Sequence, residues 1–80
     1  MSQTIYPGIP KIIDVTILNG QLTGTKYHYM GTTPKCGKPN PNLDDLANAS
    51  AFATADDSIV TVTVSMPVSQ DTTYAVLVMV

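Results

Sequence analysis

The 80-residue chain lacks several residue types that would point to particular functions. It contains no Glu, Arg or Trp, and only one Cys and one His. Four Lys and six Asp residues give a net charge of −2, with no basic stripe. Nucleic-acid binding depends on such a stripe, so we expect no nucleic-acid partner. The single cysteine, Cys36, cannot form a disulfide within the chain.

Long hydrophobic runs are also missing. No stretch reaches the length of about 18 apolar residues that a membrane-spanning helix needs, so we expect no membrane partner. The N-terminal residues show no basic region followed by an apolar run. This predicts that the chain has no signal peptide and is made in a cytoplasm, where Cys36 stays reduced.

Threonine and serine occupy the places that charged residues usually take. Charged residues make up 12% of the chain, about half the usual share, whereas there are 11 Thr and 5 Ser. Thr, Val, Ile and Tyr favour strands. The composition therefore predicts a single mainly β domain over residues 1–80, an antiparallel sandwich or open barrel of about four to six strands with one short helix.

The size of the chain favours association with other chains. A domain this small buries only about 60% of the surface that its unfolded chain exposes. Such domains usually gain stability from disulfides, metals or oligomerisation. Since a disulfide is excluded and metal ligands are scarce, we expect a homo-oligomer, with a trimer as the first state to consider.

Residues 1–11 predict an extended N-terminal arm. Pro7 and Pro10 exclude a helix, and the residue before a proline is biased toward extended backbone. Ile5, Tyr6 and Ile9 would be wasted on a free tail, so we expect the arm to lie on its own domain or on a neighbouring subunit.

Two β-hairpins are predicted, over residues 12–30 and 59–80. In the first, Asn19-Gly20 favours a type I′ turn that places Leu18 opposite Gln21 and Ile17 opposite Leu22. Gly24 marks a bulge or a close backbone approach. The expected inner faces are those of Ile13, Val15 and Ile17 and of Val60, Val62, Val64 and Met66.

Residues 31–58 predict a loop rich in proline and a short helix. The helix is expected over residues 43–50, with Asn42 as its N-cap and Asp44 and Asp45 in its first turn. Asp56-Asp57 is typical of a turn.

The stretch GTTPKCGK, residues 31–38, resembles a phosphate-binding loop at first sight. However, five residues separate Gly31 from Gly37, where the motif requires four. Pro34 removes a backbone N–H, and Pro39 stands where a magnesium-binding Ser or Thr is needed. We therefore interpret this stretch as a surface connector and expect no nucleotide cofactor.

Other candidates for chemistry are weak. Cys36 and His28 could form a nucleophile–base pair, but a surface histidine and an ordinary loop cysteine explain them better. They would supply only two zinc ligands, and the spacing of the aspartates matches no calcium loop. Asn48-Ala49-Ser50 matches a glycosylation sequon by chance. We expect no catalytic, cofactor-binding or metal-binding residues, and no enzyme activity.

The C-terminal stretch TYAVLVMV, residues 73–80, is apolar on both faces of a strand. A strand of this kind must be covered on both sides, and a partner chain is the simplest cover. Tyrosines are also common at protein interfaces. The predicted interface residues are Ile5, Tyr6, Ile9, Tyr27, Tyr29, Tyr74, Val76, Val78 and Val80.

These features predict a non-catalytic, self-assembling structural protein. Small subunits with arms and adhesive strands occur on virion and phage-head shells, so a capsid-stabilising decoration subunit on a larger protein shell is the leading hypothesis. The alternative is a small β module that binds a peptide or glycan through the tyrosine face of Tyr27 and Tyr29, or by strand addition.

Overall fold

The computed structural model describes residues 10–80, so the predicted contacts of Ile5, Tyr6 and Ile9 lie outside the described residues. Most of the described chain is strand and connecting turn. The elements in chain order are β1 (Lys11–Ile17), β2 (Thr23–Tyr27), β3 (Lys35–Cys36), β4 (Asn40–Pro41), the 3-10 helix η1 (Leu46–Ser50), β5 (Phe52–Ala55), β6 (Ile59–Thr63) and β7 (Thr72–Met79). The mainly β prediction is confirmed.

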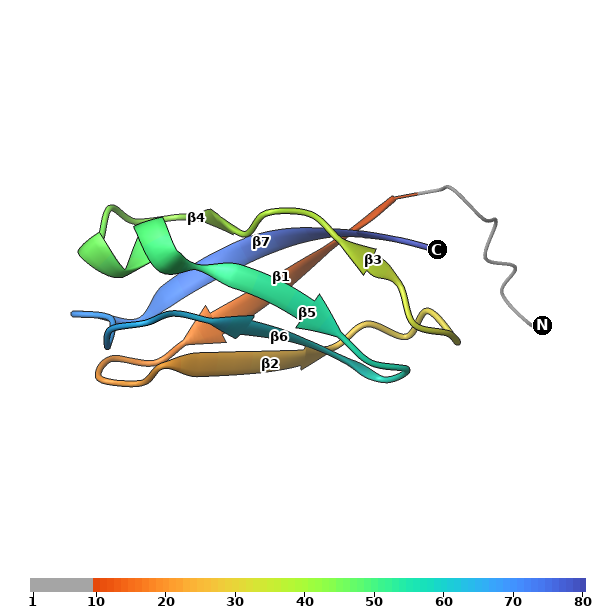
Figure 1. Cartoon of the computed structure of the whole chain (residues 1–80), viewed down its shortest axis with the longest axis horizontal. Helices are drawn as coiled ribbons and strands as arrows, with labels where there is room; N and C mark the ends of the chain where they lie inside the picture. The colour runs from red at the N-terminus through yellow and green to blue at the C-terminus, as the bar shows by residue number, and fades with distance from the viewer. Residues whose placement is uncertain (1–9) are drawn as a thin grey trace.

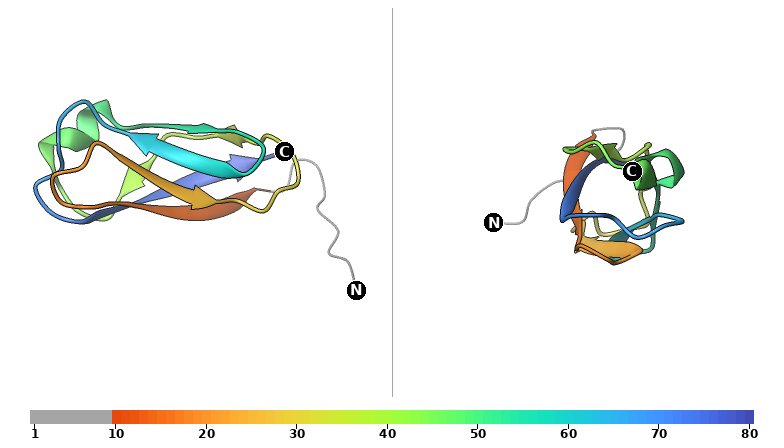
Figure 2. Two further views of the ribbon diagram at one scale, coloured as in Figure 1. Left: turned by 90° about the horizontal axis from the view of Figure 1, so that it is seen from below. Right: turned by 90° about the vertical axis from the view of Figure 1, so that its left-hand side faces the viewer.

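The strands form two antiparallel sheets (Figure 1). In the first, β7 is central: it pairs with β1 on one side and with the short strands β3 and β4 on the other. The second has the order β2-β6-β5. Figure 2 (right) looks along the strands and shows the two sheets on opposite sides of the interior.

Both predicted hairpins are wrong, because each connection crosses from one sheet to the other. β1 pairs with β7 rather than β2, and β6 pairs with β2 and β5 rather than β7. Each of β1, β6 and β7 has a strongly apolar face. Crossing between layers sets such faces against each other, whereas two separate hairpins would leave them uncovered.

The turn after β1 also differs from the prediction. The Gln21 N–H donates to the Leu18 carbonyl at 2.9 Å, and Gly20 has a φ of +83°. Asn19 does not have a positive φ, which a type I′ turn would require. A positive φ at the second central residue alone is typical of a type II turn.

The core is a single cluster made largely of valine and isoleucine. Both predicted inner faces are buried except at Met66, which lies beyond the end of β6 and is exposed. The inner face of β7 joins this core. Tyr74, Val76 and Val78 have no exposed surface, so the expectation that they contact a partner is wrong: the chain's own second sheet covers them.

The region predicted as loop and helix contains more strand and less helix than expected. The helical part is the 3-10 helix η1, and its N-cap is Asp45, whose side chain accepts from the Ala47 N–H. Asn42 instead belongs to the first sheet: its N–H donates to the Thr73 carbonyl, and its side chain accepts from the Thr73 N–H. Pro41 is accommodated because β4 is an edge strand.

Of the two alternatives predicted at Gly24, the structure shows the close backbone approach. A Cβ atom on Gly24 would lie 2.2 Å from the Thr16 carbonyl oxygen of β1. The two sheets therefore meet at a corner where β2 has no room for a side chain.

Replacing this glycine tests the corner. We expect Gly24→Ala to lower the free energy of unfolding by about 2 to 3 kcal/mol, because the added methyl group meets backbone that cannot move aside cheaply. Urea denaturation measures this. Gly37→Ala is the control: its nearest contacts would be at 3.6 Å, so a change within about 0.5 kcal/mol is expected. Equal, small losses at both positions would contradict the assignment.

Candidate functional site

His28, just after β2, is fully buried, which corrects the prediction of a surface histidine. Its backbone N–H donates to the Ser58 carbonyl at 3.0 Å. Its ring Nδ1 accepts from the Met30 N–H at 3.0 Å, so the ring proton is on Nε2, which donates to the Asp56 carbonyl at 2.7 Å. His28 therefore fixes the backbone of residues 28–30 to the turn before β6.

The two residues that flank His28 form an exposed aromatic pair, called here the tyrosine pair. The side chains of Tyr27 and Tyr29 are 60% and 74% exposed, and their ring centroids are 5.9 Å apart. The Lys11 Nζ lies 5.7 Å from the Tyr29 ring centroid and donates to the His28 carbonyl at 3.0 Å. The buried side chain of His28 thus fixes the backbone between the two tyrosines, and the Lys11 ammonium lies beside Tyr29.

Tyr29 has a backbone conformation that is unusual for its residue type. Its φ is +55°, the only positive φ at a non-glycine residue within residues 10–80. For a bulky side chain this conformation costs on the order of 1 kcal/mol or more. Burial does not offset this cost, because most of the ring faces solvent. A strained backbone at an exposed aromatic residue marks Tyr29 as a candidate functional residue.

A second exposed feature lies on the outer face of the first sheet and is called here the apolar strip: Ile12, Leu77 and Met79. Ile12 and Leu77 lie directly opposite each other in the β1–β7 register, and Met79 follows on the same face of β7. They are 58%, 44% and 39% exposed. Val80, a predicted interface residue, comes next and is also exposed.

The strip and the tyrosine pair lie at the same end of the domain. Lys11 and Ile12 are neighbours in β1, so the start of this strand connects the two features. Figure 1 shows β1 beginning at the end where β7 stops and where β2 finishes.

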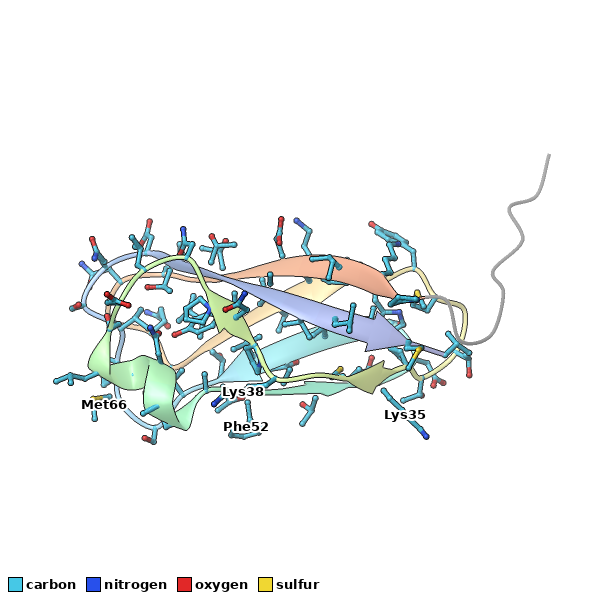
Figure 3. The ribbon with its side chains drawn as sticks, turned by 90° about the horizontal axis from the view of Figure 1, so that it is seen from above. Lys35, Lys38, Phe52 and Met66 are labelled. Carbon is cyan, nitrogen blue, oxygen red and sulfur yellow. The ribbon has the colours of Figure 1, made fainter. Side chains whose placement is uncertain are left out.

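Part of the GTTPKCGK stretch pairs with the first sheet. Lys35 and Cys36 form β3 and pair with Met79 and Val78, and the Gly37 N–H donates to the Leu77 carbonyl at 2.8 Å. In Figure 3, Lys35 points away from the domain. The stretch is therefore partly strand, which corrects its interpretation as a plain surface connector: the edge of β7 was free to pair with it.

Cys36 and His28 are not brought into a catalytic pair. Both ring nitrogens of His28 are bonded to backbone groups, so neither is free to take a proton from the thiol. Burial raises the pKa of the Cys36 thiol, which disfavours the reactive thiolate.

The aspartates hold turns. Asp45 accepts from the backbone N–H groups of Ala47 and Ser69 and from the Ser69 hydroxyl, and Asp56 accepts from the N–H groups of Ser58 and Ile59. Thr33 donates to Asp57. Within residues 10–80, no three His, Cys, Asp or Glu side chains gather as a metal site would require.

The sequon asparagine has a structural role. Asn48 is half-buried; its amide donates to the Leu43 carbonyl, and its side-chain oxygen accepts from the Tyr74 hydroxyl, each at 2.7 Å. Burial, followed by the charge of Asp45, raises the pKa of Tyr74. These bonds connect the central strand β7 to η1.

Sequence reasoning named Tyr27, Tyr29 and Val80, which the structure shows to be exposed, but it missed the apolar strip and the position of Lys11. The strip was visible as the second apolar face of β7 and as Ile12 on the mixed face of β1. What the sequence could not reveal was the pairing of β1 with β7, which brings Ile12 beside Leu77.

The chain matches no protein-family model, no curated protein and no solved structure. Among the described residues, no helix has the length and apolar character needed to cross a membrane.

Removing the ring nitrogens of His28 tests whether it anchors the tyrosine pair. We expect His28→Phe to lower the free energy of unfolding by about 2 to 4 kcal/mol, since a buried N–H and a carbonyl lose their partners. Urea denaturation gives the value. Tyr27→Phe, at an exposed site, is the control and should stay within about 0.5 kcal/mol of the wild type. A His28→Phe protein as stable as this control would contradict the anchor.

Acid should weaken the fold through Asp45 and Asp56. Hydrogen bonds, chiefly from the Ala47 N–H to Asp45 and from the Ile59 N–H to Asp56, lower the pKa of each carboxyl below its ordinary 3.8. Their stabilisation is therefore complete above that ordinary pKa and is lost as the pH falls through the lower folded-state values.

Denaturation between pH 7 and pH 2 measures this loss. The double variant Asp45→Asn, Asp56→Asn keeps an acceptor oxygen at each site but cannot titrate, so its stability should fall less over this range. An unchanged pH dependence would show that other groups are responsible.

Proposed function

We propose that the protein is a non-catalytic structural protein that works by self-assembly. The observation that carries the proposal is that only one of the two apolar faces of β7 is buried. Its inner face is buried in the core, whereas its outer face presents the apolar strip to solvent. An exposed apolar strip on a regular sheet is costly to leave uncovered, and a second copy of the chain is the simplest cover.

The contrast between the two outer sheet faces supports this choice of surface. The outer face of the second sheet carries a block of threonines: Thr23, Thr25, Thr54, Thr61 and Thr63. Phe52, labelled in Figure 3, is the large exposed aromatic at the edge of this face. The threonine block is suited to water, whereas the strip has the apolar character of an interface centre.

We further propose that the assembled subunits attach to a larger protein shell of the virion or phage-head type. Support comes from the small size, the low charge, the proline-containing N-terminal segment and the exposed apolar surface of β7. A trimer is the first assembly to test, because three-fold arrangements suit the local symmetry of such shells.

A second candidate is a β module that binds a peptide or glycan. The tyrosine pair favours it, because two adjacent aromatic rings form a stacking surface. This candidate requires a stable monomer, so the mass of the protein in solution distinguishes it from self-assembly.

Charge placed in the apolar strip tests self-assembly. We expect wild-type protein at micromolar concentration to sediment as an oligomer well above 8.5 kDa, and Leu77→Asp to weaken association at least tenfold because it buries an unpaired charge. Thr54→Asp, on the threonine block, is the matched control and should associate as the wild type does. A wild-type monomer at these concentrations would contradict the proposal.

A further inference from the structure

We propose that residues 6–10 of one copy, Tyr-Pro-Gly-Ile-Pro, dock on the tyrosine pair of a second copy. This inference rests on the proposed self-assembly and adds to it a second contact, beside the one through the apolar strip. It would join two groups of predicted interface residues, those of the N-terminal segment and those at the end of β2, in one junction.

The acceptor has the chemistry of a proline-binding surface. Extended proline-rich segments dock on closely spaced exposed aromatic rings, because the flat apolar rings match the proline ring and little chain entropy is lost. Tyr27 and Tyr29 supply two such rings 5.9 Å apart. The His28 hydrogen bonds hold the backbone between them, so the surface is formed in advance.

The strained backbone of Tyr29 supports the same occupant. The positive φ at Tyr29 costs free energy, and contacts of the exposed ring in the assembled state would offset that cost. Packing against a proline would provide them. The Lys11 ammonium, 5.7 Å from the ring centroid, flanks the surface and can bind carbonyl oxygens of an extended segment, which has no internal hydrogen bonds.

The donor segment has the matching pattern and begins in the right place. Pro7 and Pro10 have the spacing P-x-x-P, and Pro10 precedes Lys11, whose side chain reaches Tyr29. The segment therefore leaves the described domain beside the tyrosine pair.

A second copy, rather than the same chain, is the favoured source of the segment. Five residues span about 15 Å when they adopt the extended conformation that prolines favour. Since Pro10 already lies beside Lys11, such a segment would place its far residues well beyond the tyrosine pair of its own domain. To reach the tyrosine pair of its own domain, the segment would have to reverse within these few residues. Because donor and acceptor lie at one end of the domain, copies placed end to end can exchange segments.

Two complementary variants of the full chain test the junction. The donor variant is Tyr6→Ser, Pro7→Ser. The acceptor variant is Tyr27→Ser, Tyr29→Gly, in which glycine suits the positive φ and protects the fold. Loss of central aromatic contacts is expected to weaken the association of each variant about thirtyfold, measured by sedimentation velocity. Leu46→Ser, which removes an exposed side chain on η1, is the control and should associate normally.

Mixing the variants gives the decisive result. An equimolar mixture should associate more strongly than either variant alone, because the donor variant keeps an intact tyrosine pair and the acceptor variant keeps an intact segment. Wild-type association by either variant, or a mixture no stronger than its components, would overturn the junction while leaving self-assembly in place.

A peptide of residues 2–10 separates this junction from self-assembly as a whole. It should shift the amide NMR signals of residues 27–30 in the wild type and not in the acceptor variant. If the wild type is monomeric but the peptide still binds, the docking contact stands and the proposed function fails. If the peptide does not bind, or if the donor substitutions shift these signals in a monomer at every concentration, the contact between copies is overturned.

Discussion

The rest of the structure depends on covering the inner face of β7. This strand is apolar on both sides and is central in its sheet, so Tyr74, Val76 and Val78 must be opposed by a second layer. β6 supplies that layer with Val60 and Val62. The same requirement explains why the chain crosses between sheets after β1 and after β6, and why the corner at Gly24 is so tight. An 80-residue domain has only enough chain to cover the inner face of β7, so the outer face of this strand remains exposed to solvent.

Buried and exposed polar side chains differ in how their hydrogen bonds are satisfied. The buried polar side chains find partners within the chain: His28 bonds to the backbone of Met30 and Asp56, and Tyr74 bonds to Asn48. At the surface, Tyr29 is both strained and exposed. Within residues 10–80, no buried polar side-chain atom lacks a hydrogen-bond partner, whereas the strain lies at an exposed aromatic residue. The proposed self-assembly would account both for this tyrosine and for the exposed outer face of β7.

Much of the candidate site follows from residue patterns that act over short distances. Alternation of apolar and polar residues placed Ile13, Val15 and Ile17 inside, and set His28 opposite Tyr27 and Tyr29. The predictions that were wrong concern contacts between residues that are distant in sequence. His28 is buried because residues 56–58 lie against it, and the helix cap moved to Asp45 because Ser69 also bonds there. Neither neighbour is close in sequence, so no local pattern could reveal them.

The sequence by itself determined a mainly β domain, the inner faces of its main strands, the two apolar faces of β7 and a special backbone position at Gly24. These properties depend on the alternation of side chains along a strand and on the absence of a Cβ atom, both of which are local. Only the tertiary structure decided which strands pair, which face of β7 is covered, and that Ile12 joins Leu77 on the open face. Pairing partners are chosen by the burial of apolar area across the whole chain, and several arrangements satisfy the same local pattern until the two layers are packed together.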